Sequence, residues 1–134
     1  MIKLVKLIEL PYYKESDSNL VVVEGQSNFF PFSIMRVFNV RSDIDVVRGK
    51  HAHRNCTQLL ICTNGAIEVL CDNGIKTSKY VLDNVHYGLL IPPGIWAEQK
   101  YLKEDTVLTV ICDLPFDEDD YLRDYDEFIK YINN

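Results

Sequence analysis

The stretch Arg48-Gly-Lys-His-Ala-His-Arg54 places two of the chain's three histidines, His51 and His53, one residue apart. Alternate side chains of a β-strand point to the same face, so an H-x-H sequence in a strand directs both imidazoles into one space. Basic residues accompany them, although the net charge of the chain is -6. Two imidazoles on one face suit either metal ligation or proton transfer near neutral pH. The alternative interpretation is a pair of surface histidines beside basic residues at a strand end.

The residues that follow the two histidines continue a spaced pattern. Four residues separate His53 from Gln58, and six separate Gln58 from Gly65. This order resembles the first cupin motif, in which H-x-H precedes a Glu and then a Gly. The segment Pro92-Pro-Gly-Ile-Trp-Ala97 resembles the second cupin motif, which ends in P-x-G-x-x-H. The resemblance implies an all-β fold, a small cupin-like jelly-roll barrel.

The positions that bind the metal in a cupin are occupied here by His51, His53, Gln58 and Ala97. Gln58 is a poor ligand for a transition metal and Ala97 is none, whereas catalytic metals usually keep at least three protein ligands. We therefore expect no metal, with both histidines free for acid–base chemistry. No redox cofactor is expected either, because the chain has no G-x-G-x-x-G or P-loop sequence. The alternative is a metal-dependent cupin enzyme that takes His86 as a third ligand.

Length and composition limit the classes of protein to which the chain belongs. Its 134 residues predict one domain, residues 1–134, and 47% hydrophobic with 25% charged residues is an ordinary globular mix. The cysteines are scattered without a C-x-x-C pair, which is typical of free buried thiols in a reducing cytoplasm. The N-terminus lacks a signal sequence, and no apolar run approaches membrane-spanning length. We expect a cytoplasmic protein that binds neither membrane nor nucleic acid, since it is acidic and has no basic stripe.

Short strand-like segments separated by turn residues fill most of the chain and indicate a barrel or sandwich. Asn64-Gly65 predicts a hairpin that pairs residues 57–63 with 66–71. Residues 11–19 are polar and predict a loop. Residues 117–132 predict one amphipathic helix that closes the domain, with its acidic residues as a solvated face and helix start. Further strands are expected around the two histidines and at 2–9, 20–24, 29–40, 77–82, 86–91, 95–101 and 106–112.

Several polar side chains are candidates for contact with a substrate. Cations near the histidines would stabilise an enediolate or hold phosphate oxygens, and Arg36, Arg48 and Arg54 are the candidates, although each is equally consistent with a surface charge. Gln58 is expected to face the same interior as the histidines, where substrate hydroxyls would satisfy its amide. Trp96 follows a Pro-Pro-Gly turn and packs either against a base or sugar or in the core.

Four longer segments carry a more specific resemblance. R-G-K-H-A-H-R, D-N-G, G-L-L-I-P-P-G-I-W and D-E-D-D-Y-L-R-D-Y-D-E-F resemble the nucleotide-sugar 3,4-ketoisomerases, over roughly residues 29–130. These enzymes act on dTDP-4-keto-6-deoxyglucose, on the route to the 3-amino-3,6-dideoxyhexoses of surface polysaccharides. The resemblance implies a metal-free cupin-like barrel, a homodimer that exchanges N-terminal strands, and proton transfers carried out by His51 and His53.

The chain departs from that family at two positions. Members often have an aromatic residue where this chain has Asn39, and usually His or Arg where it has Ala97. The second position is tied to how the sugar is held or which C4 epimer forms. These departures keep open a different class of function, a non-catalytic protein that binds a sugar nucleotide.

Overall fold

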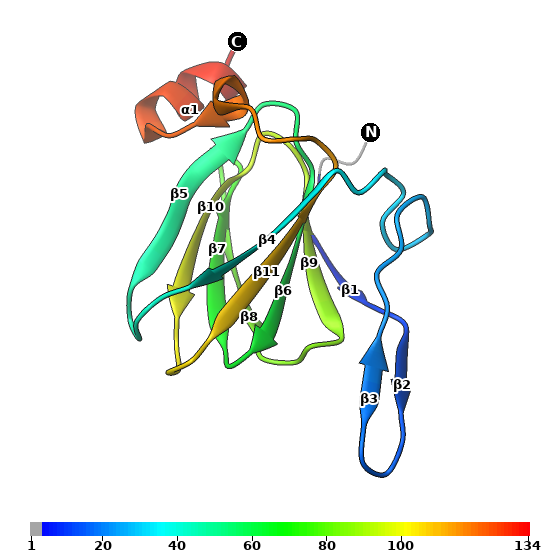
Figure 1. Cartoon of the computed structure of the whole chain (residues 1–134). Coiled ribbons are helices and arrows are strands. Elements are labelled where there is room, and N and C mark those ends of the chain that lie inside the picture. Colours follow the sequence, from blue (N-terminus) through cyan, green and yellow to red (C-terminus); the bar gives the residue numbers. More distant parts are fainter. Residues whose placement is uncertain (1–3) are drawn as a thin grey trace.

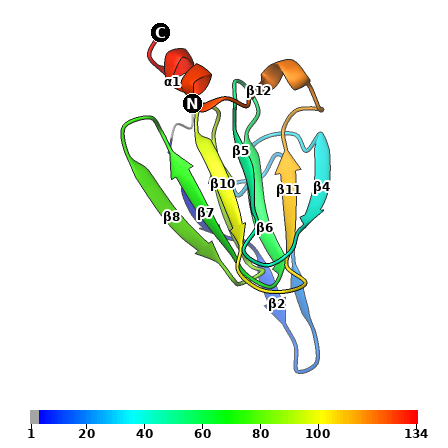
Figure 2. The same ribbon diagram turned by 90° about the vertical axis from the view of Figure 1, so that its left-hand side faces the viewer.

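Two five-stranded antiparallel sheets pack against each other, and a two-stranded hairpin extends from them (Figure 1). The computed structural model describes residues 4–134. The first sheet has the strand order β1 (Lys6–Glu9), β9 (Tyr87–Ile91), β6 (Gln58–Asn64), β11 (Val107–Cys112), β4 (Arg36–Arg41). The second, which faces the viewer in Figure 2, has the order β12 (Tyr121–Leu122), β5 (Val47–His53), β10 (Trp96–Tyr101), β7 (Ile67–Asp72), β8 (Thr77–Leu82).

The core lies between the two sheets and follows the period of two along each strand. Leu60, Val110, Val69 and Tyr101 are examples of buried side chains that reach it from both sheets. Strand β6 is apolar on both faces, because its alternate residues Leu59 and Ile61 pack under the segment that leads into β4. This explains its continuous apolar sequence, which is typical of a strand covered on both sides. The expected all-β barrel with one short C-terminal helix is confirmed.

The N-terminal part forms more strand than the sequence predicted. The segment expected as a loop, residues 11–19, contains β2 (Tyr12–Lys14), which pairs with β3 (Asn19–Val21) in a hairpin that points away from both sheets (Figure 1). Residues 2 and 3 of the expected first strand, 2–9, lie outside the described residues, and β1 begins at Lys6. The expected strand at 29–40 begins only at Arg36, because a turn around Ser27 and the extended segment after it precede β4.

The Asn64-Gly65 turn does not form the predicted hairpin. Strands β6 and β7 belong to different sheets, so this turn carries the chain from one sheet to the other. Gly65 has φ +85°, and a Cβ there would lie 2.9 Å from Thr106 Cα. The local sequence signal for a tight turn was correct, but pairing was decided by the packing of both strands with more distant partners. The turn at residues 72–74 does join the paired strands β7 and β8.

The C-terminal helix is shorter than predicted. It is α1 (Tyr125–Ile132), with Asp124 as its N-cap, and it packs Phe128 onto Trp96 and Leu122. The preceding residues form a 3₁₀ turn at Glu118–Asp120 and then β12, which pairs with the end of β5. The prediction of one helix over 117–132 was therefore wrong, because backbone pairing with β5 replaces the first helical turns. No helix in the described part of the chain is long and apolar enough to span a membrane.

Candidate active site

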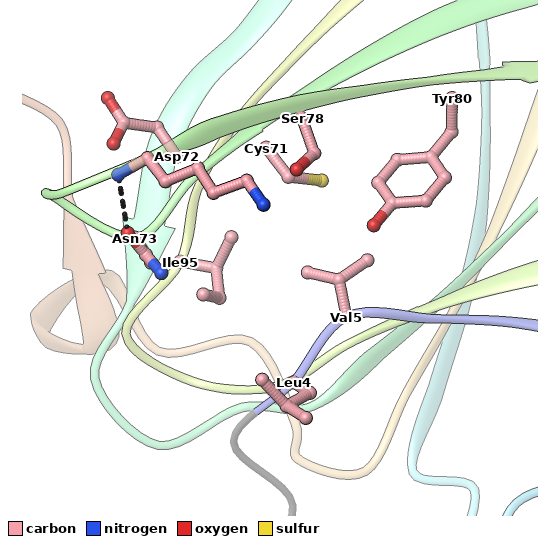
Figure 3. Close-up of a pocket in the computed structure, with 9 residues that line it drawn as sticks. Leu4, Val5, Cys71, Asp72, Asn73, Ser78, Tyr80 and Ile95 are labelled. Atoms are coloured by element: carbon pink, nitrogen blue, oxygen red, sulfur yellow. Dashed lines mark hydrogen bonds between the residues drawn. The ribbon is translucent and has the colours of Figure 1, made fainter.

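A cavity of about 180 Å³ opens between the two sheets, where β4, β5, β10 and β11 meet the returning C-terminal segment. It is lined by both polar and apolar side chains: Phe38, Val40, Arg48, Gly49, His51, Gln58, Leu60, Gln99, Tyr101, Leu108, Val110, Tyr121 and Arg123. A second cavity, of about 170 Å³, lies beside β7 and β8, where Cys71, Ser78 and Tyr80 face Leu4 and Val5 (Figure 3). Only the first of the two brings a histidine together with cations.

A β-bulge in β5 determines what faces this cavity. The pairing of β10 with β5 shifts between Ala97, opposite His51, and Glu98, opposite Gly49, so Lys50 is an extra residue. Gly49 and Lys50 both have positive φ, +83° and +56°. In a regular strand, Arg48 and His51 would point to opposite faces, since they are three positions apart. The bulge brings both to the cavity and leaves Lys50 exposed.

Position 49 in the bulge requires glycine. A Cβ on Gly49 would lie 3.0 Å from the side-chain Cδ of Gln99 and 3.1 Å from the Ala97 carbonyl oxygen, in a backbone conformation that disfavours other residues. The close approach lets the Gln99 amide lie over the bulge at the cavity wall.

The bulge also fixes the protonation of His51. Nδ1 of His51 lies 3.0 Å from the Gly49 carbonyl oxygen. A carbonyl only accepts, so Nδ1 carries the proton and donates it, which leaves the lone pair on Nε2. Burial, then the neighbouring His53, lower the pKa of His51 to about 4. His51 is therefore a neutral imidazole with a free basic nitrogen at pH 7.

His53 forms a buried dyad with Asp120. Its Nδ1 donates to Asp120 Oδ2 at 2.8 Å, and the other oxygen of Asp120 accepts from the backbone N–H of Asn55 at 2.6 Å. Burial lowers the pKa of His53, and Asp120 opposes this shift without reversing it. The contact is thus a hydrogen bond from a neutral imidazole to a carboxylate. Nε2 of His53 is buried and has no hydrogen-bond partner among the described residues.

Tyr121 lies against both histidines. Its ring centroid is 5.0 Å from that of His51 and 4.4 Å from that of His53. The Tyr121 oxygen accepts from Arg36 Nη1 at 3.4 Å, and the Arg123 guanidinium lies over the Tyr121 ring at 4.2 Å. His51, Tyr121 and Arg123 therefore line the cavity, while His53 and Arg36 contact Tyr121 without lining it. Together they form a set that can remove, relay and return protons beside positive charge.

The structure brings together some of the predicted binding residues and not others. Arg48 and Gln58 line the cavity, and Gln58 Nε2 also donates to Cys112 Sγ at 3.5 Å. Arg36 does not line the cavity and instead donates to the Tyr121 oxygen. Arg54 donates instead to the backbone carbonyls of residues 119 and 121 and lies over the ring of Tyr131, outside the cavity. The direction of the Arg54 side chain follows from strand alternation. Arg54 comes directly after His53, so the two side chains point to opposite faces of the sheet.

Trp96 is a core residue rather than part of the cavity wall. It packs edge to face on Tyr125, with ring centroids 5.3 Å apart, and its indole Nε1 donates to Glu98 Oε2 at 2.9 Å. Strand alternation explains this placement, because Ala97 faces the interior and its neighbour must face α1. Of the two interpretations of Trp96 from sequence, packing in the core matches its position.

Sequence reasoning missed Asp120, Tyr121, Arg123 and Gln99. Asp120 was included in a solvated acidic helix start, whereas its side chain is buried against His53. The D-D-Y-L-R sequence gives little strand signal, because its apolar residues Tyr121 and Leu122 are adjacent and do not alternate with polar ones. Gln99 follows Ala97 at a spacing of two on β10, which places both on the interior face.

The departures from the family pattern differ in their relation to the site. Asn39 is exposed on β4, where its Oδ1 accepts from Thr109 Oγ1 at 2.7 Å, so it does not line the cavity. Ala97 is paired with His51 across the sheet and belongs to the interior core. Only the departure at position 97 changes the space beside a candidate catalytic residue.

The donor set does not fit a cupin metal. Ala97 offers no ligand atom, Gln58 is hydrogen-bonded to Cys112, and His86 lies beside Glu9 instead, stacked on Tyr12. Among the described residues, one group of possible ligands, His53, Cys56 and Asp120, lies within 4.8 Å of one another. Its imidazole and carboxylate already form a hydrogen bond.

Several known proteins that resemble this chain in sequence and structure are sugar 3,4-ketoisomerases. The sequence matches the family described as FdtA: WxcM-like, C-terminal, over residues 3–133. The chain is 37% identical over 128 residues to the TDP-4-oxo-6-deoxy-alpha-D-glucose-3,4-oxoisomerase of Aneurinibacillus thermoaerophilus, covering 95% of this chain and 91% of that protein. It resembles QdtA, a sugar 3,4-ketoisomerase from Thermoanaerobacterium thermosaccharolyticum crystallised with TDP, at 32% identity and TM-score 0.93, covering 99% and 97% of the two chains. It also resembles a 3,4-ketoisomerase from Helicobacter canadensis, at 27% identity and TM-score 0.92, covering 97% and 98%.

The dyad predicts how His53 titrates. In Asp120→Asn, the pKa of His53 should fall below its wild-type value, because the carboxylate that favours the imidazolium is lost. The pKa of His51 should be about 4 in the wild type. Nitrogen-15 NMR of the histidine rings against pH measures both. Asp119→Asn, which removes an exposed neighbouring carboxylate, is the control and should leave His53 unchanged; an unchanged or higher His53 pKa in Asp120→Asn would contradict the dyad.

Proposed function

The chain belongs to the FdtA family (WxcM-like, C-terminal), and from this we propose that it is a sugar-nucleotide 3,4-ketoisomerase that converts dTDP-4-keto-6-deoxyglucose into a dTDP-3-keto-6-deoxyhexose. The relatives reported above are enzymes of that kind. The observation that carries the proposal is His51: a neutral imidazole with its proton on Nδ1 and its basic Nε2 free, at the wall of a cavity with His53 and cations beside it.

The reaction begins with removal of the proton on C3 of the sugar. The carbonyl at C4 acidifies this proton, and His51 Nε2 accepts it to give an enediolate across C3 and C4. Arg48 and Arg123 line the same cavity and would stabilise the negative charge that develops on oxygen. A neutral histidine is a competent base for this step near pH 7.

The second half returns a proton to carbon and moves one between oxygens. The proton on O3 transfers to O4, relayed by His53 or Tyr121, and C4 accepts a proton to leave the carbonyl at C3. The rings of His53 and Tyr121 both pack against the ring of His51, each with its centroid 5.0 Å from that of His51. Proton transfers alone balance this reaction, so the proposal includes no cofactor.

We also propose a homodimer built on the N-terminal hairpin. The hairpin of β2 and β3 extends away from both sheets, and Tyr13 and Leu20 are paired on it with 62% and 59% of their surfaces exposed (Figure 1). A two-stranded hairpin is marginally stable alone. Exchange of N-terminal strands with a second copy, around a two-fold axis, would cover these apolar side chains.

The setting of the reaction follows from its substrate. A dTDP-linked keto-sugar is expected in the cytoplasm, and a 3-keto product is the substrate for a 3-aminotransferase. We propose that the enzyme serves the synthesis of 3-amino-3,6-dideoxyhexoses for lipopolysaccharide or another surface polysaccharide.

His51→Asn tests the base. Asparagine retains hydrogen-bonding capacity but cannot accept the C3 proton, so kcat for dTDP-4-keto-6-deoxyglucose should fall by at least about 10²-fold. Binding of dTDP, measured by calorimetry, should stay near the wild-type value. His86→Asn, far from the cavity-lining residues, is the matched control and should keep wild-type turnover. Tight dTDP binding with no turnover in the wild type would instead favour a non-catalytic binding protein.

Chelation separates the proposal from a metal-dependent cupin enzyme. Protein treated with a chelator and dialysed should retain full activity, because neither the cupin positions nor His86 completes a ligand set. Loss of activity that one divalent metal restores would contradict this and would direct attention to His53, Cys56 and Asp120.

The dimer is tested at the hairpin. Light scattering should give the mass of two chains for the wild type, and Leu20→Asp should shift the mass toward one chain, because it places a charge in the buried interface. Ile75→Asp, in an exposed turn, is the control and should remain a dimer. A stable wild-type monomer with full activity would exclude strand exchange as a requirement.

A further inference from the structure

Arg36 has an unusual set of neighbours for a half-buried cation. Its guanidinium lies over the rings of Phe38 and Phe116, at 5.4 and 5.6 Å, and its Nε is buried without a hydrogen-bond partner. Within residues 4–134, no carboxylate forms an ion pair with it. Nη1 donates to the Tyr121 oxygen at 3.4 Å and Nη2 to Cys112 Sγ at 3.5 Å. The sulfur is therefore the acceptor that faces the charge where an acid would be expected.

Cys112 is at the end of β11, fully buried, with donors around its sulfur. Besides Arg36, Gln58 Nε2 donates to it at 3.5 Å from the adjacent strand β6. A neutral thiol is a weak acceptor, whereas a thiolate attracts N–H donors and cations. The neighbouring Cys56 thiol, then the Gln58 amide and the charge of Arg36, lower the pKa of Cys112 to about 6, although burial alone raises it. The Cys56 thiol itself donates to the Thr57 carbonyl oxygen at 3.5 Å.

The other cysteines lack this environment. Burial raises the pKa of Cys62 to about 11 and that of Cys71 to about 12. Cys56 keeps its proton, because the neighbouring Cys112 and burial both raise its pKa. None of the four cysteines forms a disulfide. Cys112 alone meets a cation and an amide donor together.

We propose that Cys112 is a thiolate that forms an ion pair with Arg36 and thereby positions Tyr121 at the active site. The ion pair holds Arg36 so that Nη1 donates to the Tyr121 oxygen. Because that oxygen accepts from a permanent cation, its own O–H is directed away from Arg36 and is free to donate elsewhere. Tyr121 is then set as a proton donor beside His51 and His53. Cys112 acts through Arg36 and is a positioning residue. Its effect on catalysis rests on the proposed ketoisomerase activity. The negative charge of its thiolate does not depend on that activity and can be measured without substrate.

The charge is tested without substrate. Ultraviolet absorbance near 240 nm, titrated from pH 4.5 to about 9, should show one thiolate step in the wild type with a midpoint of about 6. The titratable groups around this ion pair are Cys56, which precedes β6, and Tyr121 on β12. The charge of Asp113 contributes to raising the pKa of Cys56. The step should be absent in Cys112→Ser and unchanged in Cys62→Ser. In Arg36→Met, which leaves the sulfur in place, it should move above about pH 8.

The titration has clear contrary outcomes. A wild type with no step below about pH 8, or a step that persists in Cys112→Ser, would overturn the thiolate. A step that stays near its wild-type midpoint in Arg36→Met would overturn the ion pair. The Arg36→Met measurement uses the native cysteine, so the proposal is tested even where Cys112→Ser does not fold.

The positioning role is tested by kinetics. Cys112→Ser should lower kcat by about tenfold with little change in KM, and the same substitution in an Arg36→Met background should have no further effect, since both remove one interaction. Cys62→Ser should be neutral. Independent, multiplying effects of the two substitutions, or a higher KM with unchanged kcat, would contradict the role. A wild type without ketoisomerase turnover would refute the proposed function and leave the absorbance result standing.

Discussion

The hydrogen bond between His51 Nδ1 and the Gly49 carbonyl is the constraint on which the rest of the site depends. It exists because Lys50 is an extra residue in β5, which turns the Gly49 carbonyl toward the imidazole two residues later. The same bulge brings Arg48 to the cavity. One inserted residue thus sets the tautomer of the base and the position of a cation, and the lack of a side chain at position 49 makes room for both.

Positive charge around neutral histidines serves two purposes. Arg36 and Arg123 add to burial in lowering the pKa of His51, which keeps it a base at neutral pH. Of these two cations, Arg123 lines the cavity and would also stabilise the enediolate of the proposed reaction. The C-terminal segment supplies much of this arrangement: β12 extends the sheet beyond β5 and brings Asp120 to His53 and Tyr121 to both imidazoles.

The fold and the centre of the site could be predicted from sequence because they follow local rules. Alternation along a strand was enough to place His51 and His53 together, and turn residues marked the strands correctly at 77–82. What could not be predicted depends on distant partners. The Asn64-Gly65 turn is tight, as expected, yet its two strands pair with others across the barrel. Asp120 belongs to an acidic run that looks solvated until β12 pairs with β5 and buries one carboxylate. Arg48 lines the cavity, although strict alternation would have pointed it away from His51.

A catalytic base at His51 must exchange a proton with carbon, and solvent deuterium measures this exchange directly. In deuterated water, the wild type should introduce deuterium at C3 or C4 of the hexose of dTDP-4-keto-6-deoxyglucose. Proton NMR measures this incorporation. His51→Asn should show none on the same timescale, because asparagine has no basic nitrogen to accept the proton from carbon. Exchange at the wild-type rate in that variant would contradict the account and assign the base to His53 or Tyr121.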